Sequence, residues 1–166
     1  MFDSGAAIIV LGIVALIALP FIFNNLYKKK RDLKFLKEFK SLAEKEKIVI
    51  SQKELWNNCY AIGIDNNSRK ILYINKRKDK VEDILIDLSE VEKCRIANIN
   101  KTVKNQAGKS SISDRLELVF TFRKSDIPEK VLEFYDSKEF MPIDKDISII
   151  ENWLQVINSN LKNIKM

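Results

Sequence analysis

The pattern of hydrophobic and polar positions divides the chain into an apolar N-terminal segment, a basic helical segment and a long alternating segment. Residues 5–23 form a run of nineteen residues without a charged side chain. A helix of this length rises about 28 Å, close to the hydrocarbon thickness of a bilayer. The run therefore predicts a transmembrane helix, and we expect residues 1–27 to be a membrane anchor.

A buried core helix and a cleaved signal peptide are the alternatives to an anchor. A core helix is disfavoured because the run is apolar on all sides for five turns. A signal peptide is disfavoured because Met1, Phe2, Asp3 and Ser4 supply no positive side chain ahead of the run. An uncleaved anchor is the interpretation that we prefer.

The charges that follow the apolar run orient the predicted anchor. Residues 28–31 are Lys-Lys-Lys-Arg, and an excess of Lys and Arg stays on the cytoplasmic side of a membrane. We therefore expect the N-terminus outside and the C-terminal domain in the cytoplasm. The richness in Lys, Asn and Ile favours a bacterial origin, which places the protein in the inner (cytoplasmic) membrane.

Residues 28–47 predict a basic juxtamembrane amphipathic helix. Leu33, Leu36, Phe39 and Ala43 recur at steps of three and four residues, the spacing of one helical face. This face has two possible uses: it lies on the bilayer surface, or it packs on the domain that follows. The second use is the commoner one, and the sequence leaves both open.

From Ile48 onward the period changes to two, which is typical of half-buried β-strands. We expect short polar turns between the strands, among them a hairpin turn at residues 65–68. Leu55 and Trp56 fit the turn after the first strand, and residues 105–111 fit a loop around Gly108. The expected strands are residues 48–50, 60–64, 71–74, 84–86, 91–103, 116–122 and 131–135.

The C-terminal segment predicts an amphipathic helix that Asp144 or Asp146 caps. We expect this helix to pack across the sheet, within a β-rich domain of residues 48–166. The predicted fold class is α+β: an N-terminal transmembrane helix, then a mostly antiparallel β-sheet or barrel of about seven strands, then the C-terminal helix. The apolar positions of that helix are Ile147, Ile150, Leu154, Ile157, Leu161 and Ile164.

The order of these elements is similar to that of pleckstrin-homology-like domains. The residues that carry the resemblance are 55–58, 61–65, 86–88, 93–95, 114–120 and 132–135. Over residues 48–162 the chain resembles bacterial single-pass membrane proteins that pair one anchor with such a domain and have no established activity. The resemblance implies a bent sheet barrel with the helix at one open end. It implies no activity, because a fold does not determine a function.

The net charge of +6 is concentrated beside the predicted anchor. Residues 28–40 carry +5, from seven basic and two acidic groups, whereas residues 41–166 carry +2. This distribution favours anionic lipid headgroups over nucleic acid, which would need a basic face on the folded domain. The alternative is that the charges only fix the orientation. The candidate lipid contacts lie in this flank and in the turn at residues 76–80: Lys28, Lys29, Lys30, Arg31, Lys34, Lys37, Lys76, Arg77, Lys78 and Lys80.

The sequence predicts no catalytic, metal or cofactor site. The chain has no histidine and two cysteines, Cys59 and Cys94, too few ligands for a zinc site of the usual Cys and His type. Residues 108–110 resemble the end of a phosphate-binding loop, but Val103 stands where that loop needs its first glycine. The acidic residues within 79–87 match no calcium-loop spacing.

The function that these patterns favour is a membrane-tethered, non-enzymatic binding or scaffold module. Its expected partner is a protein of unknown identity or the anionic lipid surface. The alternative is a small accessory subunit of a membrane complex that acts through its anchor. An enzyme is disfavoured, because a Ser or Cys nucleophile would lack a histidine base.

Overall fold

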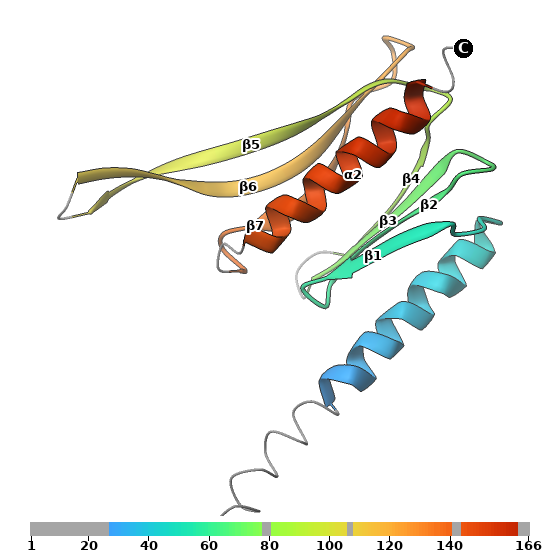
Figure 1. The fold of residues 1–166 in the computed structure, drawn as a ribbon, viewed down its shortest axis with the longest axis horizontal. Helices are drawn as coiled ribbons and strands as arrows, with labels where there is room; N and C mark the ends of the chain where they lie inside the picture. Colours follow the sequence, from blue (N-terminus) through green and yellow to red (C-terminus); the bar gives the residue numbers. More distant parts are fainter. Residues whose placement is uncertain (1–26, 78–80, 106–107, 141–143, 163–166) are drawn as a thin grey trace, which may run out of the picture. The chain divides into compact units, whose positions relative to one another are not determined.

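The computed structural model describes residues 27–77, 81–105, 108–140 and 144–162. The chain divides into two compact units after Leu42, and each is described by itself. The smaller unit contributes the first part of a helix at residues 27–45, and the larger unit, Ala43–Met166, contains the strands and the C-terminal helix (Figure 1).

The helix at residues 27–45 buries Phe35, Phe39 and Ala43, which recur every fourth residue, and leaves Leu33 57% exposed. Its end has the hydrogen bonds of a Schellman motif: Ile48 N donates to Ala43 O at 2.8 Å, and Lys47 N donates to Glu44 O at 3.0 Å. Lys47 takes the left-handed conformation that this motif requires, with φ of 57°.

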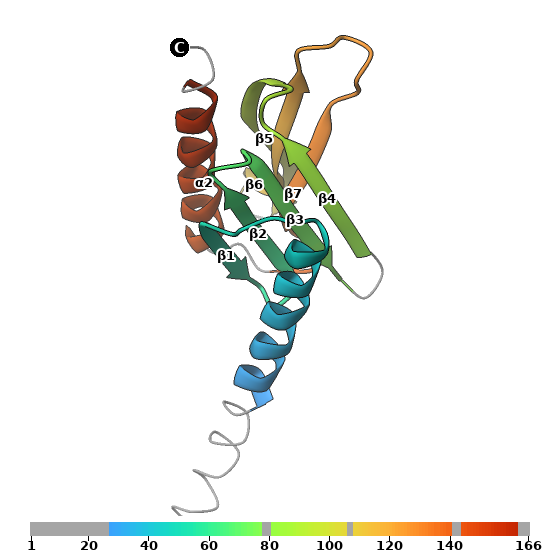
Figure 2. The same cartoon turned by 90° about the vertical axis from the view of Figure 1, so that its right-hand side faces the viewer.

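The strands form two antiparallel sheets. Sheet A has the order β1-β2-β3-β4, with β1 at Gln52–Trp56, β2 at Tyr60–Asp65, β3 at Lys70–Lys76 and β4 at Val81–Asp87 (Figure 2). Sheet B has the order β5-β6-β7, with β5 at Val91–Asn105, β6 at Gly108–Phe122 and β7 at Lys130–Asp136.

The predicted fold class is therefore wrong as it was stated. Over the described residues the architecture is α+β with two separate antiparallel sheets and two helices, not one continuous sheet or barrel. Among the residues that the structure describes, no helix has both the length and the apolar character needed to cross a membrane. The anchor predicted at residues 5–23 lies outside the described residues.

The chain passes from sheet A to sheet B through a short buried connection after β4. Leu88 and Val91 are both fully buried in the core, and Leu88 N donates to Arg69 O at 2.9 Å. The Asp87 carboxylate accepts hydrogen bonds from Ser89 N and Ser89 Oγ, which closes the turn. Burial of Leu88 and Val91 directs the chain into the core at this turn. Strand β5 then pairs with β6 in sheet B and not with β4 in sheet A.

The first strand lies later than the sequence predicts. Residues 48–50 have no regular structure, and β1 instead includes the predicted turn residues Leu55 and Trp56. The reason is the tight turn that follows, in which Asn57 and Asn58 have φ of 49° and 55° and Cys59 N donates to Trp56 O. Two left-handed residues in succession make a tight turn, after which Trp56 pairs with Tyr60 at the start of the hairpin of β1 and β2.

The hairpin of β5 and β6 is longer than the sequence predicts. The expected loop at residues 105–111 is wrong for most of its length, because β6 begins at Gly108 and its residues pair with β5. Strand β7 pairs only with the part of β6 from Arg115 to Phe120. The rest of the hairpin is a two-stranded ribbon. The predicted strand at residues 91–103 reaches into it, but residues 108–113 give no strand signal in the sequence, because they are held by main-chain pairing with β5.

Helix α2, at Asp144–Lys162, packs against sheet B, chiefly against β5 (Figure 1). Its buried side chains include Ile150, Trp153 and Ile157, whereas the predicted core position Ile147 is 42% exposed. Asp146 is buried, and its Oδ1 accepts a hydrogen bond from Asn57 Nδ2 at 3.2 Å. The two sheets and α2 share one hydrophobic core.

Candidate functional site

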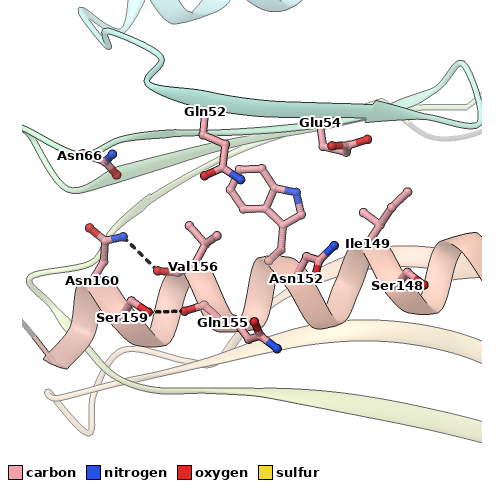
Figure 3. Close-up of a pocket in the computed structure, with 11 residues that line it drawn as sticks. Gln52, Glu54, Asn66, Ser148, Ile149, Asn152, Gln155, Val156, Ser159 and Asn160 are labelled. Atoms are coloured by element: carbon pink, nitrogen blue, oxygen red, sulfur yellow. Dashed lines mark hydrogen bonds between the residues drawn. The ribbon is translucent and has the colours of Figure 1, made fainter.

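A groove of about 750 Å³ lies between strand β1 and helix α2 (Figure 3). Its volume falls in the range of ligand pockets. Its residues come from β1, from the β2–β3 turn and from α2: Gln52, Glu54, Asn66, Ser148, Ile149, Asn152, Trp153, Gln155, Val156, Ser159 and Asn160.

The groove exists because β1 turns polar where its neighbour is apolar. In β2, Ile62 and Ile64 are fully buried members of the core. In β1, Gln52 and Glu54 line the groove, and of the strand's residues only Trp56 is buried. Burying Gln52 and Glu54 against α2 without hydrogen-bond partners would cost free energy, so a space remains between β1 and α2.

The α2 side of the groove combines an apolar floor with amide groups. Trp153 is 2% exposed and also belongs to the core. Figure 3 shows Asn152 and Ile149 directed from the helix toward β1. Asn160 Nδ2 donates to Val156 O at 2.9 Å, which holds that amide on the helix. Asn152 and Gln155 have no side-chain hydrogen-bond partner among the described residues, so both amides are available to a ligand.

Within the described part of the chain, strand β1 has one hydrogen-bonded neighbour, β2, and its other side forms the edge of sheet A beside the groove. Strand β7 is also an edge strand, but side chains of sheet A occupy its carbonyl groups. Trp56 Nε1 donates to Phe134 O at 2.9 Å, and Tyr73 OH donates to Glu133 O. These two bonds cover the β7 edge and join the sheets.

A buried ion cluster lies behind these bonds. Arg77 Nη1 is 3.1 Å from Glu133 Oε1 and 3.2 Å from Asp136 Oδ2, and the three side chains are 7%, 9% and 11% exposed. Tyr60 OH donates to Glu133 Oε1 at 2.8 Å. One guanidinium thus balances two carboxylates that would otherwise be costly to bury. The cluster ties β7 to the end of β3 and serves stability.

The electrostatics of the cluster follow from burial and from the paired charges. Burial opposes the charged form of Arg77 and is the largest single effect, but Glu133, Tyr60 and Asp136 together outweigh it and raise the pKa of the guanidinium. Burial also works to raise the pKa of Asp136, but hydrogen bonds from Lys138 N and Arg77 hold it below its ordinary value. Burial and the adjoining Glu133 raise the pKa of Tyr60, so its hydroxyl stays protonated.

The two cysteines are buried thiols. Burial raises the pKa of both Cys59 and Cys94 to about 12. Because the thiolate is the reactive form, neither is suited to nucleophilic chemistry. Among the described residues, no cluster of three or more His, Cys, Asp or Glu side chains has the arrangement of a metal site.

The predicted lipid contacts differ in their exposure. Those on the helix at residues 27–45 are exposed, and so is Lys76. Arg77 is different, because its guanidinium is buried in the ion cluster and does not reach the surface. Lys78 and Lys80 lie outside the described residues. The exposed positions on the helix are Lys28, Lys29, Lys30, Arg31, Lys34 and Lys37.

Sequence reasoning missed the groove entirely. The available signal was the pair Gln52 and Glu54 in a strand that precedes two apolar ones, together with the Asn- and Ser-rich side of the C-terminal helix. It also missed the pairing of Arg77 with β7, since 56 positions separate Arg77 from Glu133. Comparison of the chain with protein-family models, with curated proteins and with solved structures gives no significant match.

Proposed function

We propose that this chain is a membrane-tethered, non-enzymatic binding module, and that it binds a segment of a partner protein in the groove between β1 and α2. The observation that carries the binding role is the groove itself: a volume of about 750 Å³ with a tryptophan floor and amide-rich walls. Amide side chains both donate and accept hydrogen bonds, so they suit a peptide main chain, which also does both.

The membrane part of the proposal rests on the sequence. The uncharged run at residues 5–23 and the basic residues after it support tethering to a membrane with anionic headgroups. Their exposure on the helix at residues 27–45 is consistent with contact to those headgroups. The partner remains a protein segment, because the groove has no cluster of cations that would suit a phosphate.

A peptide-display experiment tests the binding role. Full-length protein in detergent micelles is used to select from a library of random dodecapeptides, and the affinity of each selected peptide is measured by fluorescence anisotropy. Asn152→Arg places a long charged side chain in the groove. Asn158→Arg is the matched control, because it makes the same substitution on the same helix at a position that does not line the groove.

We expect Asn152→Arg to weaken binding at least about tenfold, since a bulky cation has to be displaced or desolvated, and Asn158→Arg to leave the affinity within about twofold of the unmodified protein. Selection of no peptide above background, or equal binding by the two variants, would overturn the proposal. Quenching or a shift of tryptophan fluorescence by the bound peptide provides a second measurement, and in the Trp56→Phe variant this signal comes from Trp153 alone.

A further inference from the structure

We infer that the groove takes its peptide in one particular form: an extended segment that adds to β1 as a fifth strand of sheet A, with a Lys or Arg side chain beside Glu54. This inference deepens the proposed function and rests on it. Three observations carry it: the dimensions of the groove, the open side of β1 and the position of a single charge.

The dimensions fit one strand. The helix side of the groove runs from Ser148 to Asn160, and twelve helical steps cover about 18 Å. Strand β1 has five residues and extends for about 17 Å. An extended segment of five or six residues would therefore match the groove along its length.

The main chain of β1 supplies the hydrogen bonds for strand addition. Among the described strands its one neighbour is β2, so the N–H and C=O groups of its other side point along the sheet edge. The edges at β7 and β4 are partly occupied. Trp56 donates to β7 at Phe134 O, and Lys130 Nζ donates to β4 at Leu85 O, 3.0 Å away. Edge pairing of this kind is a common way to bind peptides.

The one charged residue that lines the groove, Glu54, determines which peptide side chain we expect opposite it. Glu54 is the one ionisable residue among those that line it, and it has no ion-pair partner among the described residues. In an added strand, the residue directly opposite Glu54 lies on the same face, about 5 Å away between Cβ atoms. A Lys or Arg at that position would neutralise Glu54, and its neighbours two positions away would face Gln52 and Trp56.

The test starts from the tightest peptide of the display selection as its probe. Each residue of the probe is N-methylated in turn, which removes one main-chain donor at a time. If the probe adds to β1, methylation lowers the affinity about tenfold or more at every second residue and has little effect between them. A flat response would overturn strand addition, and the Asn152→Arg result would still stand as evidence for the groove.

Charge reversal tests the contact with Glu54. Selection on the Glu54→Lys variant should replace the basic residue of the peptides with Asp or Glu, and the original probe should lose about fivefold in affinity. Glu92→Lys is the matched control, because Glu92 is exposed on β5 and does not line the groove. If selection on Glu54→Lys returns the same basic peptides as selection on the unmodified protein, the pairing with Glu54 is overturned.

A second copy of the chain is the competing occupant. Light scattering of the full-length protein over a range of concentrations distinguishes the two. A dimer that Asn152→Arg dissociates would show that a second copy occupies the groove, and would overturn the assignment of a peptide. A particle mass that is unaffected by Asn152→Arg supports it.

Discussion

The buried cluster around Arg77 leads to a prediction whose size follows from the structure. Replacing Arg77 with Met keeps most of the side-chain volume but removes the cation between Glu133 and Asp136. Both carboxylates lose a partner at 3.1–3.2 Å, in a site where their side chains are 9% and 11% exposed. Because solvent does not replace the lost charge, we expect a strong loss of stability.

The magnitude is about 3–5 kcal/mol, the usual cost of leaving buried charges without their partner. Glu133 still accepts the Tyr60 hydroxyl, which favours the lower half of this range. A single domain is stable by only about 5–15 kcal/mol, so the loss is a large share of the total. With an ordinary urea dependence the midpoint of unfolding should fall by about 2 M.

The assay is urea unfolding of the full-length protein in detergent, followed by tryptophan fluorescence. The matched control is Arg95→Met, which breaks an ion pair with Glu129 at 3.4 Å whose side chains are each 46% exposed. Exposed pairs contribute about 0–1 kcal/mol, so the control should stay close to the unmodified protein. If Arg77→Met does not fold, Arg77→Lys replaces it in the assay. This variant keeps the charge, so we expect a smaller but measurable loss in the free energy of unfolding.

The pH dependence separates a lost charge from a lost contact. In the unmodified protein the pKa of Asp136 is lowered, so its contribution is present above the ordinary pKa and is lost as the pH falls through the lowered value. In Arg77→Met the part of that contribution that comes from Arg77 is absent, while the hydrogen bond from Lys138 N remains, and the difference between the two proteins should narrow as the pH falls. Equal effects of Arg77→Met and Arg95→Met, or a difference that widens in acid, would refute the reasoning.

Four further outcomes are expected. Asp65→Ala leaves main-chain N–H groups of the Val49 segment and the β2–β3 turn without an acceptor, at a cost of about 1–3 kcal/mol in urea unfolding. Burial opposes ionisation of Asp65, but those bonds lower its pKa to about 2, so the Asp65 contribution should be lost as the pH falls from about 4 to 2. Trp56→Phe removes the bond to the β7 carbonyl and should cost about 1–2 kcal/mol by the same assay. Lys47→Gly relieves a left-handed residue and should raise the thermal midpoint, with a gain of about 1 kcal/mol. Cys59 should resist alkylation at pH 8 until the protein is unfolded, as mass spectrometry would record.

Several elements were predictable because their signals are local. The alternation at residues 60–64, 71–74 and 131–135 falls within β2, β3 and β7. The turn between β2 and β3 was expected from its run of Asp, Asn and Ser, and Asp65 does accept bonds from the N–H groups of Asn67 and Ser68. The C-terminal helix followed from the spacing of its apolar residues, although its buried face is rotated toward Ile149 and Trp153.

Other elements depended on distant partners. The sequence predicts β1 too early because the limits of this strand come from its pairing with β2 after the turn at Asn57 and Asn58. A short alternating run carries no information about which strand pairs with it. For the same reason the sequence predicts a loop where part of the β5–β6 ribbon lies. The sequence predicts Arg77 as a surface cation in a polar turn. In the fold, Glu133 lies beside it and both side chains are buried.

The sequence by itself determined the local features of this protein: strand periodicity, turn residues, an amphipathic C-terminal helix and a basic segment at residues 28–40. The tertiary structure alone decided the division into two sheets, the covering of the β7 edge and the groove between β1 and α2. The physical reason is that periodicity and turn preference act over a few residues. The groove depends on which strand ends a sheet and on which helix face meets it, and these are contacts between segments about ninety positions apart.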